Sequence, residues 1–306
     1  MSGKLRLYKD KLEGYKRFYA IVKTIKMVTL AKYRQLVSRV KSRDNTLRYA
    51  EKAFGSFQEV TEEEVMKAAT KPLLYVAIST NRGSCGALNS NMVKYIDSVV
   101  NNDGAFKGVK IACAGKKGCD SLNRLYPGNF AMGFINDMKN PLTFAYATFL
   151  LEGSLAAAPE AERTQIVFNR YISAGQQRQA SYNIPSFEKF LERMNQVASS
   201  EEDKANYSFA NALVNNDDII VKDYYDFQSA LMVQNAVVEN ELSEYAARVV
   251  AVEGQLTNIM QLQLRTAYLY NKTRQSSITA SLIEILSAMS SLEGNAAKGV
   301  KKDAFW

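Results

Sequence analysis

The sequence predicts an α/β domain inserted between two long terminal helices that pair as an antiparallel coiled coil. Proline and glycine interrupt helices, and neither residue occurs between Gly14 and Gly55. No proline follows Pro185, and Gly254 is the only glycine between Gly175 and Gly294. Both ends of the chain can therefore form long helices. The middle, where proline and glycine are frequent, cannot.

The first segment, residues 1–56, predicts a basic amphipathic helix. Its apolar residues Phe18, Ile21, Ile25 and Val28 recur at intervals of three and four, and lysine and arginine are frequent among the other positions. This spacing places the four side chains on one helical face. We therefore expect an apolar stripe on a strongly basic helix.

The last segment, residues 201–292, predicts a helix with the narrow apolar stripe of a coiled coil. Apolar side chains repeat strictly at intervals of three and four, at Leu242, Tyr245, Val249, Val252, Leu256 and Ile259. A helix over 225–292 would be about 100 Å long, against about 75 Å for one over 4–54. We expect the two to wind around each other, with the C-terminal helix extending about 25 Å further.

The middle, residues 70–200, predicts a Rossmann-like α/β domain with a largely parallel sheet. Short apolar runs typical of strands cover 73–79, 109–115 and 165–173. Helical stretches near 89–100, 116–125 and 143–158 alternate with them. Alternation of this kind is typical of parallel sheets with crossover helices. Residues 199–216 are expected to be a helix or a linker.

Composition excludes several kinds of chemistry. The 306 residues include no histidine and only three cysteines, Cys85, Cys113 and Cys119, without the spacing of metal ligands. We expect no catalytic residue, no bound metal and no cofactor, and we expect the cysteines to be small core or turn residues. No apolar run is long enough to cross a membrane.

The basic charge is concentrated at the N-terminus. Residues 1–52 carry 15 Lys/Arg against 4 Asp/Glu, so this segment holds more than the whole net charge of +8. Such a segment is compatible with nucleic acid, anionic lipid, an import signal or an acidic protein surface, and also with a merely solvated helix. A nucleic-acid-binding protein that uses this helix is therefore an alternative function.

A second alternative rests on the segment STNRGSCGALN, residues 79–89, between a predicted strand and a predicted helix. Glycines there could let backbone N–H groups approach a phosphate, as in a nucleotide-dependent α/β enzyme. The pattern matches neither a P-loop nor the dinucleotide fingerprint. A tight turn from strand to helix is the simpler interpretation.

The C-terminal helix changes character at YNKTRQSSIT, residues 270–279. Beyond it, Ile278, Leu282, Ile285, Met289 and Leu292 continue an apolar stripe. A second stripe of small side chains runs beside it, at Thr273, Ser277, Ala280, Ser287 and Ser291. A plain coiled coil would place charged pairs beside its apolar stripe. This helix instead carries small and apolar side chains there, which favours contact with another protein over contact with water.

These segments resemble the γ subunit of F-type ATP synthases. The resemblance is carried by SEYAARVVAV (243–252), YNKTRQSSIT (270–279) and LIEI (282–285), by IKMVTLAKY (25–33), and by STNRGSCGALN. It implies a central rotor shaft without an active site, which couples rotation of the membrane c-ring to conformational change in the catalytic β subunits. The implied partners are the α and β subunits, the c-ring and small central-stalk subunits of the δ/ε type. Nucleic acid is not among them, and membrane contact occurs only through the complex.

The resemblance also implies site residues. Thr273, Arg274 and Gln275 match the position where the family contacts a loop of one β subunit. Ile25 stands at a coupling position usually filled by methionine, and Lys26 and Lys32 lie on the helix that faces an acidic segment of β. The implied bearing surface consists of Ile278, Leu282, Ile285 and Met289.

Location and the C-terminal tail are expectations of the same resemblance. The expected location is the matrix side of the mitochondrial inner membrane, bound peripherally, with the cytoplasmic side of a bacterial inner membrane as the alternative. The chain extends past the family's usual end by residues 293–306, and this extension is expected to emerge beyond the bearing.

Overall fold

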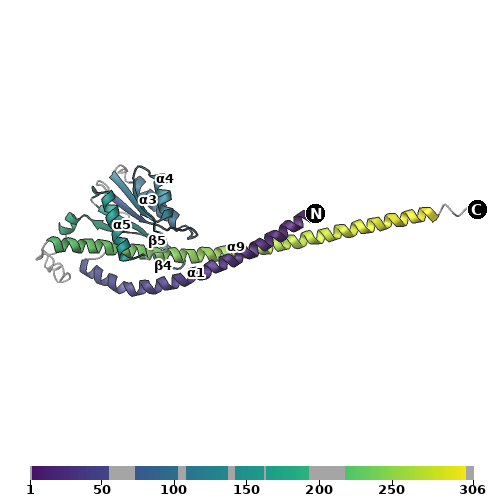
Figure 1. Cartoon of the computed structure of the whole chain (residues 1–306), viewed down its shortest axis with the longest axis horizontal. Coiled ribbons are helices and arrows are strands. Elements are labelled where there is room, and N and C mark those ends of the chain that lie inside the picture. Colours follow the sequence, from purple (N-terminus) through teal and green to yellow (C-terminus); the bar gives the residue numbers. More distant parts are fainter. Residues whose placement is uncertain are drawn as a thin grey trace, which may run out of the picture. The chain divides into compact units, whose positions relative to one another are not determined.

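The computed structural model describes residues 2–54, 73–102, 108–136, 142–161, 163–192 and 218–300. Of these, residues 2, 41–54, 99, 101–102, 218 and 293–300 are described by their backbone alone. The contacts divide the chain into two units, one made of residues 1–27 and 252–306 and the other of residues 28–251. The terminal helices α1 (Ser2–Phe54) and α9 (Asp218–Val300) each contribute to both units (Figure 1).

The unit of residues 28–251 is built on a five-stranded sheet in the order β3-β2-β1-β4-β5. β1 pairs in parallel with β2 and with β4, and β2 pairs in parallel with β3. Only β5, paired with β4, is antiparallel. The strands are β1 (Leu73–Ile78), β2 (Val109–Ala114), β3 (Phe130–Phe134), β4 (Arg163–Ser173) and β5 (Gln176–Pro185).

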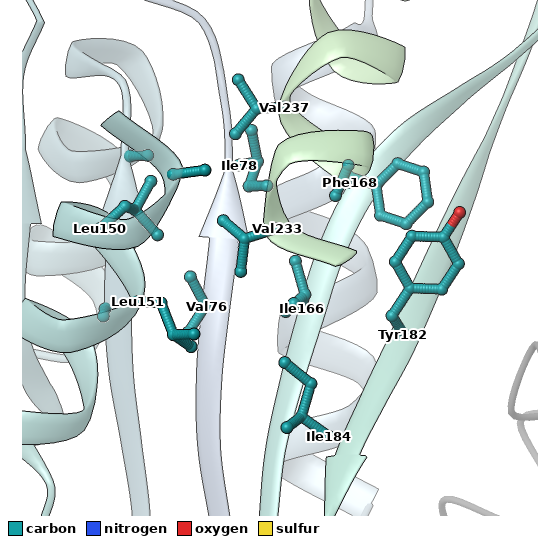
Figure 2. Packing of buried hydrophobic residues seen from close by; sticks show 14 of the residues in the cluster. Val76, Ile78, Leu150, Leu151, Ile166, Phe168, Tyr182, Ile184, Val233 and Val237 are labelled. Carbon is teal, nitrogen blue, oxygen red and sulfur yellow. The ribbon is translucent and has the colours of Figure 1, made fainter. Parts of the chain in front are cut away.

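Helices cover both faces of this sheet because its central strands are apolar on both sides. Leu74, Val76 and Ile78 of β1 pack toward α5 (Phe144–Ala157) and toward α9 around Val233 (Figure 2). The alternate β1 residues, Tyr75 among them, pack toward α3 (Leu88–Asn102) and α4 (Lys116–Leu125). Successive side chains of a strand point to opposite faces, so the sheet is the middle of three layers.

The predicted α/β domain is confirmed, with two strands added. β1, β2 and β4 lie where the apolar runs predicted them, and α3, α4 and α5 lie in the predicted helical stretches. The sequence analysis missed β3 and β5. β3 is a short apolar run of five residues, FAMGF, whose Gly133 weakens the strand signal. β5 is a polar strand at the edge of the sheet, with half-buried residues at half of its positions, and it lacks the apolar run by which a buried strand is found.

The unit of residues 1–27 and 252–306 is a pairing of the two terminal helices. Val22 is buried against Val252, Leu256 and Ile259. Four residues later on α1, Lys26 forms an ion pair with Glu253 at 2.7 Å. Because moving forward along α1 means moving backward along α9, the two helices are antiparallel, as predicted.

The predicted coiled-coil stripe of α9 is confirmed. Leu242, Val252, Leu256 and Ile259 are buried, and Tyr245 and Val249 are half-buried. In the unit of the paired termini, shielded side chains continue the same three-and-four spacing along α9 as far as Ala280. These positions are Val252, Leu256, Ile259, Gln263, Thr266, Tyr270, Thr273, Ser277 and Ala280.

The apolar stripe predicted to characterise α1 is not its packing face. Phe18, Ile21, Ile25 and Val28 are between 45% and 66% exposed. Between Gly3 and Met27, the shielded side chains are Leu5, Tyr8, Leu12, Tyr15, Tyr19, Val22 and Lys26. These positions also follow three-and-four spacing, on the neighbouring face of the helix. A pair of helices buries only one narrow stripe of each, and here tyrosines, whose rings are largely apolar, provide it.

Some expectations fall outside the described residues. The helix or linker expected at 199–216 lies wholly outside the described residues, and so does the end of the tail, residues 301–306. The placement of the tail beyond a bearing and the domain boundaries stay predictions. In the part of the chain that the structure describes, no helix is both long and apolar enough to span a membrane.

Candidate functional site

The predicted contact residues Thr273, Arg274 and Gln275 lie on α9, and all but Thr273 are exposed. Arg274 and Gln275 are exposed, and among the residues that the structure describes neither side chain has a partner within the chain. Thr273 is half-buried, and its hydroxyl donates a hydrogen bond to the backbone oxygen of Leu269 at 2.8 Å. Arg274 and Gln275 can therefore offer their donors to another molecule. Thr273 lies on the face toward α1.

Beyond this point α9 presents an apolar surface with almost no charge. Ile278, Leu282, Ile285 and Met289 are between 53% and 57% exposed, and every residue from Ser281 to Leu292 is exposed. Glu284 is the only charged side chain between Gln275 and Leu292. Ile283 and Leu286 extend the apolar surface around the helix, each more than 60% exposed. A helix that is apolar on several sides is normally enclosed by other protein.

The predicted contact residues of α1 divide into one that faces outward and two that face α9. Ile25 is 45% exposed. Lys26 donates to Glu253 at 2.7 Å. Lys32 is half-buried, and with Arg39 it lowers the pKa of Glu241, which burial raises above its ordinary value. The sequence pattern of α1 could not show which of its residues face α9, because the register between two helices is set by their tertiary packing.

The Lys26–Glu253 pair is expected to contribute little to stability. The Lys26 side chain is 30% exposed and that of Glu253 is 61% exposed, and exposed ion pairs contribute about 0–1 kcal/mol. A double-mutant cycle with Lys26→Ala and Glu253→Ala, measured by urea denaturation, should give a coupling free energy below about 1 kcal/mol. A coupling above that range would show that the pair helps to hold the helices in register. The Arg17–Glu13 pair within α1, more exposed still, is the matched control.

The glycine-containing turn after β1 serves to cap α4. The backbone N–H of Lys116 donates to Asn81 Oδ1 at 3.0 Å, and that of Gly118 donates to Ser79 Oγ at 3.0 Å. The N–H of Lys117 donates to the backbone oxygen of Thr80 at 3.0 Å. Free N–H groups at a helix start are what bind a phosphate, and these three are already bonded within the chain. The segment 79–89 is thus a turn between β1 and α3 whose polar groups occupy the N–H groups at the start of α4. The nucleotide site stays an untested alternative.

All three cysteines are buried, as expected of small core residues. Burial raises the pKa of the Cys85 thiol. The neighbouring Cys119 thiol and burial raise the pKa of Cys113. A neutral buried thiol is a poor nucleophile, so Cys85 and Cys113 have a structural role.

A buried polar network, which the sequence analysis missed, attaches α9 to the sheet. Asn240 accepts from Asn169 Nδ2 at 2.8 Å and donates to the backbone oxygen of Ser79 at 3.3 Å. Ser243 donates to the backbone oxygen of Asn169 at 2.8 Å. The available signal was the presence of Asn240 and Ser243 within a stretch of α9 that is rich in apolar residues.

Comparison with known proteins decides the family. The family model described as ATP synthase matches residues 4–292. The mitochondrial γ subunit of ATP synthase from Trypanosoma brucei brucei is 58% identical over 306 residues, which are 100% of this chain and 98% of the relative. The chain belongs to the ATP synthase γ-subunit family. The resemblance read from the sequence is confirmed.

Other relatives and solved structures agree on the ATP synthase γ-subunit family. The mitochondrial γ subunit from Ipomoea batatas is 28% identical over 292 residues, covering 94% of this chain and 85% of the relative. A chain of the Euglena gracilis mitochondrial ATP synthase, solved with OSCP, F1 and c-ring, matches with a TM-score of 0.86 at 44% identity, over 100% of both chains. A rotor chain of the same enzyme matches with a TM-score of 0.79, over 91% of this chain and 100% of that one. Nothing in these matches favours the nucleic-acid alternative.

Proposed function

We propose that this chain is the central rotor shaft of an F-type ATP synthase, which couples proton-driven rotation of the c-ring to conformational change in the catalytic β subunits. The observation that carries the proposal is the exposed, nearly uncharged end of α9, residues 278–292. A shaft must present such a surface to the subunits that enclose it. Hydrolysis of ATP would drive the same rotation in reverse.

The apolar end of α9 suits a bearing because apolar contacts have no preferred direction. Ile278, Leu282, Ile285 and Met289 can slide past an apolar sleeve without breaking a directed bond at any particular angle. A ring of salt bridges would instead hold the shaft at fixed angles. The isolated charge of Glu284 is consistent with this requirement.

Arg274 and Gln275 suit a grip on one β subunit. Their exposed side chains carry several N–H donors and one amide oxygen. A hydrogen bond to a charged group contributes about 1.5–3 kcal/mol, enough to favour one angular position and small enough to break at each step. Thr273 precedes these two residues on α9 and is half-buried. We include it in the grip because the resemblance does.

Ile25 belongs to a second apolar surface that could contact the catalytic subunits. It lies in the exposed stripe with Phe18, Ile21 and Val28 on α1. We include Ile25 among the coupling residues for this reason. Lys26 and Lys32 stay predictions as contacts with β, since each already faces a carboxylate of α9.

The proposed partners follow from the family. They are the α and β subunits, the c-ring and small central-stalk subunits of the δ/ε type, with the membrane contacted only through the complex. One of the Euglena structures that the chain matches was solved with F1, OSCP and a c-ring. Because the γ subunits named above are mitochondrial, we propose peripheral placement on the matrix side of the inner membrane.

Purification of the tagged native chain tests the proposal. We expect it to co-purify with ATPase α and β subunits, and the association should survive nuclease treatment. A native chain found alone and monomeric would exclude the rotor function. The nucleic-acid alternative predicts instead a salt-sensitive affinity for DNA or RNA that is lost when Lys23, Lys26 and Lys32 are neutralised.

A further inference from the structure

A cavity of about 230 Å³ opens at the carboxyl ends of the parallel strands in the unit of residues 28–251. It is lined by Ile78 and Ser79 at the end of β1, and by Ala114 and Gly115 at the end of β2. Asn136, which lies just after β3, also lines it. In open α/β sheets, ligands bind at this edge. The small volume suits a small ligand better than a dinucleotide.

Three helices complete the cavity. α1 contributes Lys32 and Arg39, α5 contributes Tyr146, and α9 contributes Glu241 and Glu244. The wall beside them is fixed, because Asn81 bonds to the backbone of both Lys116 and Asn136. Asn240, another lining residue, is held by Asn169. Asn81 and Asn240 are therefore fixed parts of the cavity wall.

Three of the lining side chains can donate hydrogen bonds to a ligand. Within the described part of the chain, the side chains of Lys32, Tyr146 and Asn136 have no hydrogen-bond partner. Burial raises the pKa of Tyr146 to about 12, so its hydroxyl keeps its proton at neutral pH. Ligand oxygens could accept from all three groups. This inventory favours an oxyanion.

Two carboxylates also line the cavity, and only one is open to a ligand. Glu244 is buried and forms an ion pair with the buried Arg248. Glu241 is half-buried, and Lys32 and Arg39 act on it only at a distance, since no ion pair joins it to a described residue. A carboxylate facing an oxyanion is repulsive unless the anion itself carries a proton to donate.

We propose that this cavity binds inorganic phosphate, with Lys32, Tyr146 and Asn136 donating hydrogen bonds to its oxygens and the Glu241 carboxylate accepting a hydrogen bond from its P–OH group. Hydrogen phosphate carries a P–OH group at neutral pH, whereas sulfate is fully ionised and would place an oxygen lone pair against the carboxylate. A phosphomonoester is largely dianionic at pH 7, so it lacks this proton as well. Glu241 is thus the specificity residue of the site. The proposal does not depend on the rotor function, because it uses neither the exposed end of α9 nor a partner subunit.

Equilibrium dialysis of the full chain against radiolabelled phosphate tests the site. We expect saturable binding to one site, with sulfate and glycerol 3-phosphate competing at least tenfold less well than unlabelled phosphate. Lys32→Met should weaken phosphate binding at least tenfold, as expected for loss of a charge-assisted hydrogen bond. Tyr146→Phe, which removes only a hydroxyl, should weaken it several-fold. Glu241→Gln should abolish the preference, so that sulfate competes as well as phosphate.

Lys23→Met is the matched control, since Lys23 is an exposed lysine of α1 that does not line the cavity. It should leave phosphate binding unchanged. Equal losses in Lys23→Met and Lys32→Met would show binding to the basic helix and overturn the proposal. Absence of saturable binding by the unmodified chain, or no preference for phosphate over sulfate, would overturn it equally. Circular dichroism of each variant establishes that it is folded.

Discussion

Gly118→Ala is expected to destabilise the α/β unit by about 2–4 kcal/mol, through overpacking and a weakened hydrogen bond. A Cβ atom at Gly118 would lie 2.4 Å from Ser79 Oγ and 2.7 Å from Cys113 Sγ. Neither neighbour can withdraw easily. Cys113 is fully buried near the carboxyl end of β2, a strand inside the sheet, and Ser79 Oγ bonds to the backbone oxygens of Ala114 and Gly115 at 2.8 and 2.9 Å.

The matched control is Gly254→Ala in α9, where an added Cβ meets no atom within 4 Å. Replacing a glycine within a helix by alanine normally stabilises by about 0.5–1 kcal/mol. The same chemical change should therefore raise the urea denaturation midpoint at position 254 and lower it at position 118. If Gly118→Ala were as stable as the unmodified chain, α4 would not be packed against Ser79 as described.

The fold could be predicted where local pattern and tertiary structure agree. The apolar runs at β1, β2 and β4 indicate strands buried on both faces, and all three lie in the middle of the sheet. The spacing along α9 likewise identified Val252 and Ile259 as packing residues before any partner was known. Each assignment required only the periodicity of one element.

Prediction failed where two patterns compete within one element. α1 carries two apolar stripes at heptad spacing, and the more hydrophobic one, including Ile21 and Ile25, is exposed. The buried stripe is built from Tyr15, Tyr19 and Val22. Choosing between them requires the register against α9, which is not a local property. The same register turns Lys26 toward Glu253.

In the candidate site too, the sequence predicts which residues are exposed but not which atoms they contact. Arg274, Gln275 and Ile278 are exposed because they lie outside the paired stripe of α9, and Leu282, Ile285 and Met289 are exposed because that stripe ends at Ala280. Which atoms they contact depends on another subunit, and that contact is a proposal. The phosphate cavity had no local signal at all, since its polar groups come from residues as far apart as Lys32, Asn136 and Glu241.

Arg274→Ala combined with Gln275→Ala is expected to lower coupled ATP synthesis by about tenfold or more while leaving assembly largely intact. The double variant removes one charge-assisted and one neutral hydrogen bond to β, together about 2–4 kcal/mol, and each 1.4 kcal/mol is about a factor of ten in an equilibrium. Assembly should persist because the apolar surface from Ile278 to Met289 is unchanged.

The measurement is ATP synthesis and ATP hydrolysis by membrane vesicles that contain the assembled enzyme. Asn271→Ala combined with Lys272→Ala is the matched control, since both residues are exposed on the same turn of α9 and neither is assigned to the grip. If the grip sets an angular position, synthesis should fall more than hydrolysis, because without it the shaft slips under load while nucleotide still turns over. Equal activity of the two double variants would remove Arg274 and Gln275 from the contact with β and leave the apolar surface as the sole coupling element on this helix.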